Sequence, residues 1–159
     1  MVTALIFAGG TGKRMNSRSK PKQFLEMHGK PIIIYTLEHF EYHNEIDRIL
    51  IVCLNDWIEE LKGLLKRYGI TKVVNIVPGG ETGHDSIYNG LVAMQECSEA
   101  NDIVLIHDGV RPLINEELIS QNIKAVKQYG NAITAEAARE SVVRSVDGNS
   151  ICEVPLRSQ

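Results

Sequence analysis

The fold is indicated first by residues 3–10, Thr3-Ala4-Leu5-Ile6-Phe7-Ala8-Gly9-Gly10, a short apolar run that ends in two glycines. A continuous apolar run of this length, bounded by a turn signal, is typical of a strand that is buried on both faces. Such strands belong to parallel sheets, whose faces are covered by helices. The rest of the chain should therefore alternate between strands and amphipathic helices.

The following segments show that alternation, because β-branched runs are separated by runs with apolar residues at helical spacing. Asn55 or Asp56 is the candidate N-cap of the second helix, and Thr82 or Asp85 that of the third. We expect residues 1–137 to form an α/β domain, a Rossmann-like, mostly parallel sheet with helices on both faces. The predicted helices are Pro31–Tyr42, Asn55–Tyr68, Asp85–Cys97 and Asn115–Tyr129, and the later strands are Asp47–Leu54, Thr71–Val77, Asp102–Ile106 (the most buried by composition) and Asn131–Ala137.

Residues 138–159 depart from this rhythm. Two alternating stretches, residues 140–146 and 150–154, flank Asp147-Gly148, which is a tight-turn signal. The pattern predicts a β-hairpin arm that follows a single domain and packs on something other than its core. A solvated hairpin is the simpler interpretation of the same residues.

Composition excludes several classes of protein. The chain has 159 residues, 43% of them hydrophobic, and a formal charge of −3, which excludes a disordered chain or a small disulfide scaffold and argues against a nucleic-acid partner. No apolar run approaches the roughly 18 residues of a membrane span. Cys53, Cys97 and Cys152 are odd in number and lack CxxC spacing, so we expect reduced thiols in a cytoplasmic protein.

Three polar, glycine-rich segments follow predicted strands, at residues 8–22, 78–86 and 107–112. Ligands of such sheets bind beyond the carboxyl ends of the strands, so these three loops should converge on one site. In the first loop, glycines allow backbone N–H groups to approach phosphate oxygens, and Arg14 and Lys22 add positive charge. Met15 excludes the dinucleotide fingerprint and Arg14, following Lys13, excludes the P-loop, while a plain turn with solvated basic residues is the alternative.

The other two loops carry candidate ligands as well. Asp108 follows a strand, where a carboxylate can hold Mg²⁺ together with substrate phosphates, and Arg111 could reach a phosphate or simply pair with Asp108. We interpret His107 as a core histidine with satisfied hydrogen bonds. Ser86 could bind a ligand, whereas helix capping explains Asp85 equally well.

Together these residues resemble the family of cytidylyltransferases that act on polyol phosphates, over essentially the whole chain. Four motifs in order carry the resemblance: Ala8-Gly9-Gly10-Thr11-Gly12-Lys13-Arg14-Met15, Pro21-Lys22-Gln23-Phe24, Gly79-Gly80 with Asp85-Ser86, and His107-Asp108-Gly109-Val110-Arg111-Pro112.

The resemblance implies a role for each matching position. The loop Ala8, Gly9, Gly10, Thr11 and Gly12 would wrap the CTP triphosphate, with the catalytic cations Arg14 and Lys22 at the α-phosphate. The cytosine and ribose pocket would include Gly80, Glu81 and Ser86, and Asp108 and Arg111 would lie beside Mg²⁺ and the substrate. In the family the arm crosses a homodimer, and here its Ser141 and Arg157 would contact the polyol phosphate of the other subunit.

The sequence also departs from the family pattern. Gly83 stands where a basic residue is common, and the family continues for several dozen residues beyond this chain. The Ala8-Gly9-Gly10 form and Val110 favour ribitol 5-phosphate over 2-C-methyl-D-erythritol 4-phosphate as acceptor. The expected reaction is in-line attack of the acceptor phosphate on the α-phosphorus of CTP, with release of pyrophosphate. A sugar-1-phosphate nucleotidyltransferase using another nucleotide, or a truncated, non-catalytic nucleotide-binding partner, are the alternatives.

Overall fold

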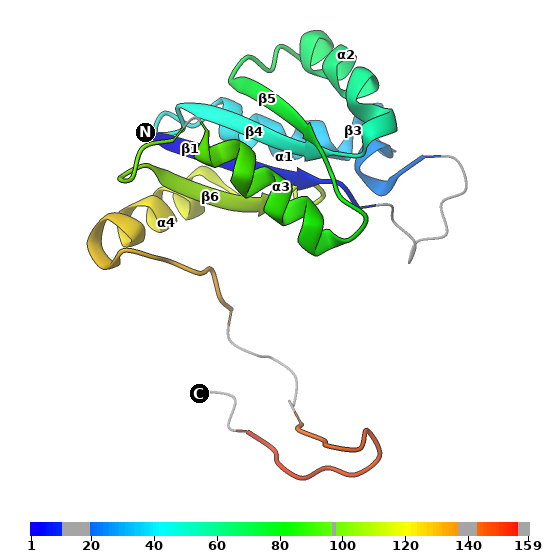
Figure 1. Cartoon of the computed structure of the whole chain (residues 1–159), viewed down its shortest axis with the longest axis vertical. Helices are drawn as coiled ribbons and strands as arrows, with labels where there is room; N and C mark the ends of the chain where they lie inside the picture. The colour runs from blue at the N-terminus through cyan, green and yellow to red at the C-terminus, as the bar shows by residue number, and fades with distance from the viewer. Residues whose placement is uncertain (11–19, 97, 137–142, 156–159) are drawn as a thin grey trace.

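The structure, a computed structural model, describes residues 1–10, 20–96, 98–136 and 143–155. A four-stranded parallel sheet of order β5-β4-β1-β6 forms its centre (Figure 1). The strands are β1 (Val2–Ala8), β4 (Arg48–Cys53), β5 (Val73–Pro78) and β6 (Ile103–Asp108). The helices are α1 (Ile32–Glu41), α2 (Ile58–Tyr68), α3 (Gly83–Gln95) and α4 (Glu116–Tyr129). The predicted Rossmann-like α/β class is confirmed.

The opening strand is central, as its apolar sequence predicts. β1 pairs with β4 on one side and with β6 on the other, both in parallel. Ala4, Leu5 and Ile6 have no exposed surface, because helices cover both faces of this strand. Burial of a side chain as large as Leu5 or Ile6 stabilises the folded state by about 1.5–3 kcal/mol. β1 therefore contributes strongly to the stability of the sheet.

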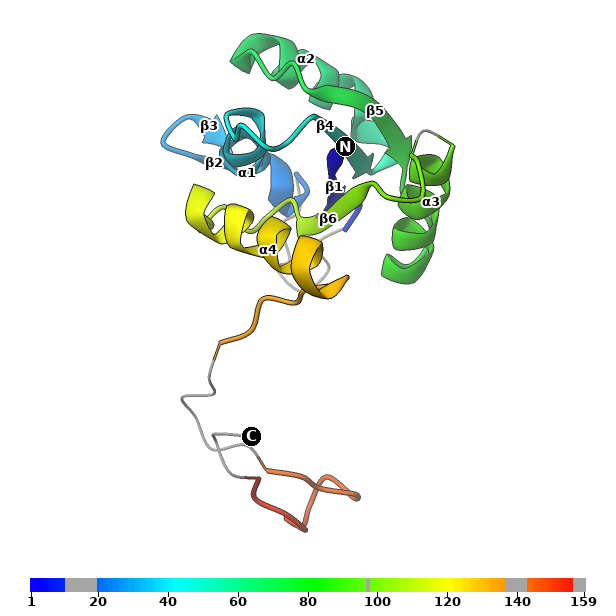
Figure 2. The same cartoon turned by 90° about the vertical axis from the view of Figure 1, so that its left-hand side faces the viewer.

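Helices cover the two faces unequally (Figure 2). One face packs against α1, α2 and α4, which contribute Leu37, Leu61 and Ile123 to the larger apolar core. The other face packs against α3, whose Met94 joins Leu5 and Leu50 in a smaller core. Helices on both faces leave the carboxyl edge of the sheet open to a ligand.

The helix ends follow the sequence signals at four places. Gly69 and Gly130 end α2 and α4 with positive φ angles of 68° and 84°, and Asn115 caps α4. Thr82 is the N-cap of α3 and forms a capping box with Asp85. The second helix differs from the prediction, since Asn55–Trp57 form a 3₁₀ turn (η3) and neither Asn55 nor Asp56 caps α2 with its side chain.

Two strand predictions are wrong. In the sheet formed by the described residues, β6 is an edge strand rather than the most buried one, and Ile106 is 57% exposed. Residues 131–136 form no strand, although the pattern predicts one over Asn131–Ala137, and Ala137 lies outside the described residues. The Thr134 hydroxyl instead forms hydrogen bonds with the Asn122 side chain of α4. Residues 131–136 therefore contact the helix and do not pair with β6.

Residues 143–155 double back through one isolated antiparallel bridge, but none of them belongs to a strand, whereas the sequence pattern predicts a hairpin of two strands. Arg144 and Glu153 form an antiparallel bridge, and the Asp147 carboxylate accepts hydrogen bonds from the backbone N–H groups of Asn149 and Ser150. The pKa of Asp147 lies far below its usual range, because the Ser150 side chain, first of all, and then these two backbone N–H groups donate hydrogen bonds to its ionised carboxylate. The segment leads away from the sheet (Figures 1 and 2).

Candidate active site

The carboxyl ends of β1 and β6 and the turn after β5 surround a cavity of about 600 Å³. The three polar loops of the sequence therefore do converge. The predicted site residues that line this cavity are Ala8, Gly9, Gly10, Lys22, Gly80, Glu81, Ser86 and Asp108.

Two glycine turns form one wall because they pack closely. A Cβ on Gly9 would lie 3.2 Å from Ser86 Oγ, and one on Gly79 would lie 3.0 Å from the same atom. A Cβ on Gly80 would lie 2.2 Å from the Asp85 Cβ, a distance that no side chain tolerates. Gly9 and Gly79 thus let the turn after β1 and the turn after β5 touch, and Gly80 lets the second turn pack against the start of α3.

Ser86 holds this wall together. Its buried hydroxyl donates to the Thr82 carbonyl oxygen at 3.0 Å and accepts from the Gly80 N–H at 3.1 Å. Because its one proton is used in this way, Ser86 can offer a ligand only a lone pair. Asp85 serves the capping box, where hydrogen bonds from the Thr82 side chain and backbone lower the pKa of its carboxyl.

Lys22 reaches the cavity from the 3₁₀ turn η2 (Lys22–Phe24). The next two residues, Gln23 and Phe24, hold this turn in place. The buried Gln23 side chain donates from Nε2 to the carbonyl oxygens of Ala8 at 2.6 Å and Gly10 at 3.2 Å. Phe24 stacks on Trp57 with 4.7 Å between ring centroids. Lys22 is therefore fixed relative to the glycine turn, and Gln23 is a site residue to which sequence reasoning assigned no role.

Asp108 enters the cavity from the end of β6. Its Oδ1 accepts from the Val110 N–H at 3.1 Å, and the next residue, Gly109, donates from its N–H to the Phe7 carbonyl oxygen at 2.8 Å. A Cβ on Gly109 would lie 3.0 Å from that oxygen, so glycine allows the loop to touch β1. The carboxylate therefore sits on a loop that is fastened to the central strand.

Arg111 and His107 border a second depression of about 560 Å³ between β6 and α4. Arg111 does not line the first cavity, so the loop carries Asp108 toward one hollow and Arg111 toward its neighbour. His107 Nε2 lies 3.0 Å from the Arg111 carbonyl oxygen, and its ring contacts Phe40. Burial lowers the pKa of His107, which agrees with its interpretation as a neutral histidine with a satisfied hydrogen bond.

The donor set fits a magnesium ion that is held mainly by a ligand's phosphates. Among the described residues no cluster of three or more His, Cys, Asp or Glu side chains could hold a metal by itself. Asp108 supplies one carboxylate at the cavity, and Mg²⁺ commonly takes one or two carboxylates together with phosphate oxygens and water.

Five predicted site residues, namely Thr11, Gly12, Arg14, Ser141 and Arg157, lie outside the residues that the structure describes. None of the helices in the described ranges has the length and apolar character needed to cross a membrane.

The fold is shared with solved nucleotidyltransferases. A nucleotidyl transferase from Methanothermobacter thermautotroptrophicus superposes with a TM-score of 0.58 at 18% identity, over 78% of this chain and 57% of that chain. The chain itself belongs to the IspD family, described as 2-C-methyl-D-erythritol 4-phosphate cytidylyltransferase, whose model matches residues 2–159.

Individual relatives are similar over nearly the whole chain. Ribitol-5-phosphate cytidylyltransferases from Streptococcus agalactiae and Vibrio parahaemolyticus are 50% and 58% identical over 159 and 158 residues, 100% and 99% of this chain. The chain spans 66% of the length of both. A 2-C-methyl-D-erythritol 4-phosphate cytidylyltransferase from Clostridium botulinum is 44% identical over 140 residues, 88% of this chain and 59% of that relative.

One solved structure is similar throughout as well. The 4-diphosphocytidyl-2C-methyl-D-erythritol synthase from Anaerococcus prevotii superposes with a TM-score of 0.79 at 28% sequence identity. The superposition covers 99% of this chain and 65% of the synthase chain.

Proposed function

We propose that the cavity binds CTP and that the full protein transfers CMP from CTP to a polyol phosphate, releasing pyrophosphate. The observation that carries this proposal is the meeting of the glycine turn, Lys22 and Asp108 in one cavity of a chain that belongs to this family. Ribitol 5-phosphate is the favoured acceptor, because the relatives at 50% and 58% identity bear that name.

The chemistry needs charge neutralisation more than a protein nucleophile. The acceptor phosphate is already an anion, and it attacks the α-phosphorus of CTP in line while pyrophosphate leaves. Two polyanions must approach each other, so the obstacle is their repulsion. The backbone N–H groups of residues 9–12 would hold the triphosphate, and Lys22 and Arg14 would neutralise charge that develops at the α-phosphate.

Mg²⁺ is the proposed cofactor. When bound, it supplies further neutralisation of the triphosphate, and Asp108 is the residue that would hold it. Asp108 is suited to this because the fastened Gly109 peptide keeps its backbone in place at the cavity.

The proposed nucleoside pocket lies on the other glycine turn, at Gly80, Glu81 and Ser86. The acceptor would approach from the side of Arg111, whose depression adjoins the cavity through Ile106 and His107. Ser141 and Arg157 of a second copy would complete acceptor binding, so a homodimer joined by the arm is part of the proposal. The free thiols of Cys53 and Cys152 support a cytoplasmic location. We expect neither a nucleic acid nor a membrane as partner, in keeping with the formal charge of −3.

The acceptor is tested by supplying the full protein with CTP, Mg²⁺ and either ribitol 5-phosphate or 2-C-methyl-D-erythritol 4-phosphate, and measuring pyrophosphate. We expect kcat/KM to be at least about tenfold higher with ribitol 5-phosphate, a difference of about 1.4 kcal/mol in transition-state binding. EDTA should abolish turnover and Mg²⁺ restore it. Equal turnover with UTP, GTP or ATP would favour a sugar-1-phosphate nucleotidyltransferase, and nucleotide binding without turnover would favour a non-catalytic partner.

The role of Lys22 is tested by Lys22→Ala in the same assay. We expect kcat to fall by at least about a hundredfold, as when one preorganised donor to a developing anion is removed. Lys20→Ala is the matched control, since Lys20 is exposed and does not line the cavity. Turnover that survives Lys22→Ala within a few-fold contradicts the assigned role.

A further inference from the structure

A polar stripe on α1 faces the loop that carries Asp108 and Arg111. Thr36, His39 and His43 follow each other at intervals of three and four residues, the spacing of one helix face. Thr36 is fully buried and His43 is 3% exposed, among core residues such as Leu37 and Phe40. Polar residues that interrupt an apolar face need a reason, since an unpaired buried polar group is costly.

Each of the three side chains meets a backbone carbonyl within residues 109–116, which comprise the loop after β6 and the first residue of α4. Thr36 Oγ1 donates to the Gly109 oxygen at 3.0 Å, His39 Nε2 lies 3.0 Å from the Pro112 oxygen, and His43 Nε2 lies 3.3 Å from the Glu116 oxygen. Every partner lies 73 positions further along the chain, so residues 109–116 run alongside α1 in the same direction.

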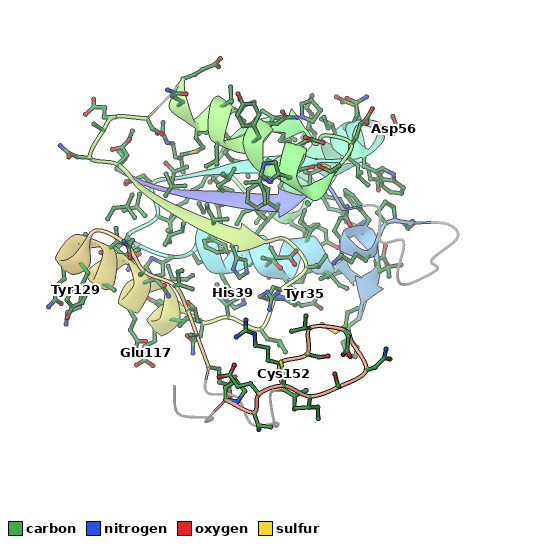
Figure 3. The ribbon with its side chains drawn as sticks, turned by 60° about the horizontal axis from the view of Figure 1, so that its bottom comes forward. Tyr35, His39, Asp56, Glu117, Tyr129 and Cys152 are labelled. Carbon is green, nitrogen blue, oxygen red and sulfur yellow. The ribbon has the colours of Figure 1, made fainter. Side chains whose placement is uncertain are left out.

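The histidines are donors in these pairs. A carbonyl oxygen only accepts, so the proton of His39 must be on Nε2 for this bond to form. In His43 the Nδ1 atom accepts from the Glu45 N–H at 3.1 Å, which places the proton on Nε2, also 3.0 Å from Ser120 Oγ. His39 is on the side of α1 that Figure 3 brings forward, beside the loop that follows β6.

The loop is therefore fastened from two directions. The N–H of Gly109 bonds to β1 through the Phe7 oxygen, and its oxygen bonds to α1 through Thr36. Asp108 directly precedes this peptide, and Arg111 directly precedes Pro112, whose oxygen is bonded to His39. Asp108 and Arg111 thus each stand one residue before a carbonyl group that α1 holds, so losing either hydrogen bond would loosen the backbone that carries the side chain.

We propose that Thr36 and His39 are positioning residues, which set the places of Asp108 and Arg111 by holding the carbonyl groups of Gly109 and Pro112. Neither side chain lines the proposed nucleotide cavity, so both act through the loop. This inference rests on the proposed function for its kinetic consequence, whereas its structural consequence can be measured independently.

The test uses two matched pairs of variants of the full protein. Thr36→Val removes the donor at nearly constant volume and Thr36→Ser keeps it, while His39→Leu removes the donor and His39→Gln offers an amide N–H at similar reach. The first readout is backbone hydrogen exchange of residues 109–111. We expect exchange to be at least about tenfold faster in the Val and Leu variants and near the wild-type rate in the Ser and Gln variants.

The second readout separates the two substrates. Thr36→Val, which loosens the backbone beside Asp108, should lower kcat by about five- to tenfold. His39→Leu, which loosens the backbone beside Arg111, should raise KM for the polyol phosphate by a similar factor and leave KM for CTP within about twofold. Thermal unfolding confirms that the variants fold. The proposal is overturned if exchange does not change, or if Ser and Gln are as impaired as Val and Leu. If the wild-type protein transfers no cytidylyl group, the proposed function fails and exchange alone decides the positioning role.

Discussion

Cys53 illustrates how completely one residue beside the cavity is removed from solvent. It ends β4, has no exposed surface, and its carbonyl oxygen accepts from the Gly79 N–H at 2.7 Å. Burial raises the pKa of its thiol to about 11, because the thiolate would lose its hydration. Although it lies next to the wall of the cavity, Cys53 is thus a packing residue and no nucleophile.

This environment makes Cys53 inert toward alkylation. In the native protein at pH 8, iodoacetamide should modify Cys53 at least about a hundredfold more slowly than the exposed Cys152, since the thiolate is the reactive form. Peptide mass spectrometry of the timed reaction measures both rates, and labelling in urea, where the two rates should converge, is the control. Native rates within tenfold of each other contradict the burial of Cys53.

Single residues differ in how well the sequence identified them. The place of Lys22 and Asp108 at the cavity could be predicted, because charge beside a glycine turn, or at the end of a parallel strand, falls at the edge where ligands bind. For Ser86 the sequence favours a ligand contact over helix capping, and no local pattern shows that its proton is donated to the Thr82 carbonyl oxygen. Gln23, Thr36 and His39 bond to carbonyl groups that are distant in sequence or irregular in structure, and no local pattern marks such partners.

At the scale of elements, Glu41 links the end of α1 to the start of β5. Its carboxylate accepts from the Thr71 N–H at 2.9 Å, the Thr71 hydroxyl at 2.5 Å and the Lys72 N–H at 2.9 Å. Burial would by itself raise the pKa of Glu41, but these hydrogen bonds together lower it below its usual value. The folded state thus favours the ionised form and is stabilised by it.

The stability from Glu41 should depend on pH in a defined direction. It is fully present above the unfolded pKa of about 4.3 and is lost as pH falls through the lower folded value. Glu41→Gln should cost about 1.5–3 kcal/mol at pH 7, and the loss should shrink below about pH 4. Urea unfolding at both pH values measures this, with Glu45→Gln at the exposed Lys127 pair as a control near zero.

Helices and strands were predicted well where local sequence signals determine their limits. They were predicted poorly where the limits or the place in the sheet depend on a neighbouring strand. The helices α1, α3 and α4 start and end within a few residues of their predicted limits, because caps and apolar spacing are local. The order of strands is not local, so an apolar run at Ile103–Asp108 could not be recognised as an edge strand. Residues 131–136 have strand-like composition, but a strand also needs a paired neighbour.

At the scale of the whole molecule, the arm exposes more apolar surface than a solvated hairpin needs. Val146 is 87% exposed and Ile151 is 63% exposed, and the hydrogen bonds observed for residues 143–155 join atoms within that segment. Apolar side chains gathered in this way are typical of an interaction surface. This supports the proposed dimer, in which the arm of one copy packs on the other.

The dimer is tested with the variant Ile151→Asp. Burying a charge in the interface should raise the dimer dissociation constant at least about thirtyfold, or about 2 kcal/mol. Sedimentation equilibrium of the full protein measures it, with Asn149→Asp as a control that adds the same charge to an exposed polar position of the arm. A wild-type monomer at micromolar concentration, or equal effects of both variants, contradicts an interface formed by Ile151.

The central place of β1 has a consequence for the growing chain. Along the chain β1 precedes both of its neighbours, and one of them, β6, is complete only at Asp108. At roughly 5–20 residues per second, the hundred or so residues in between take about 5–20 s to synthesise. For that interval one edge of the most apolar strand has no partner, so chaperones that shield nascent chains should matter more for this protein than for one whose first strand pairs locally.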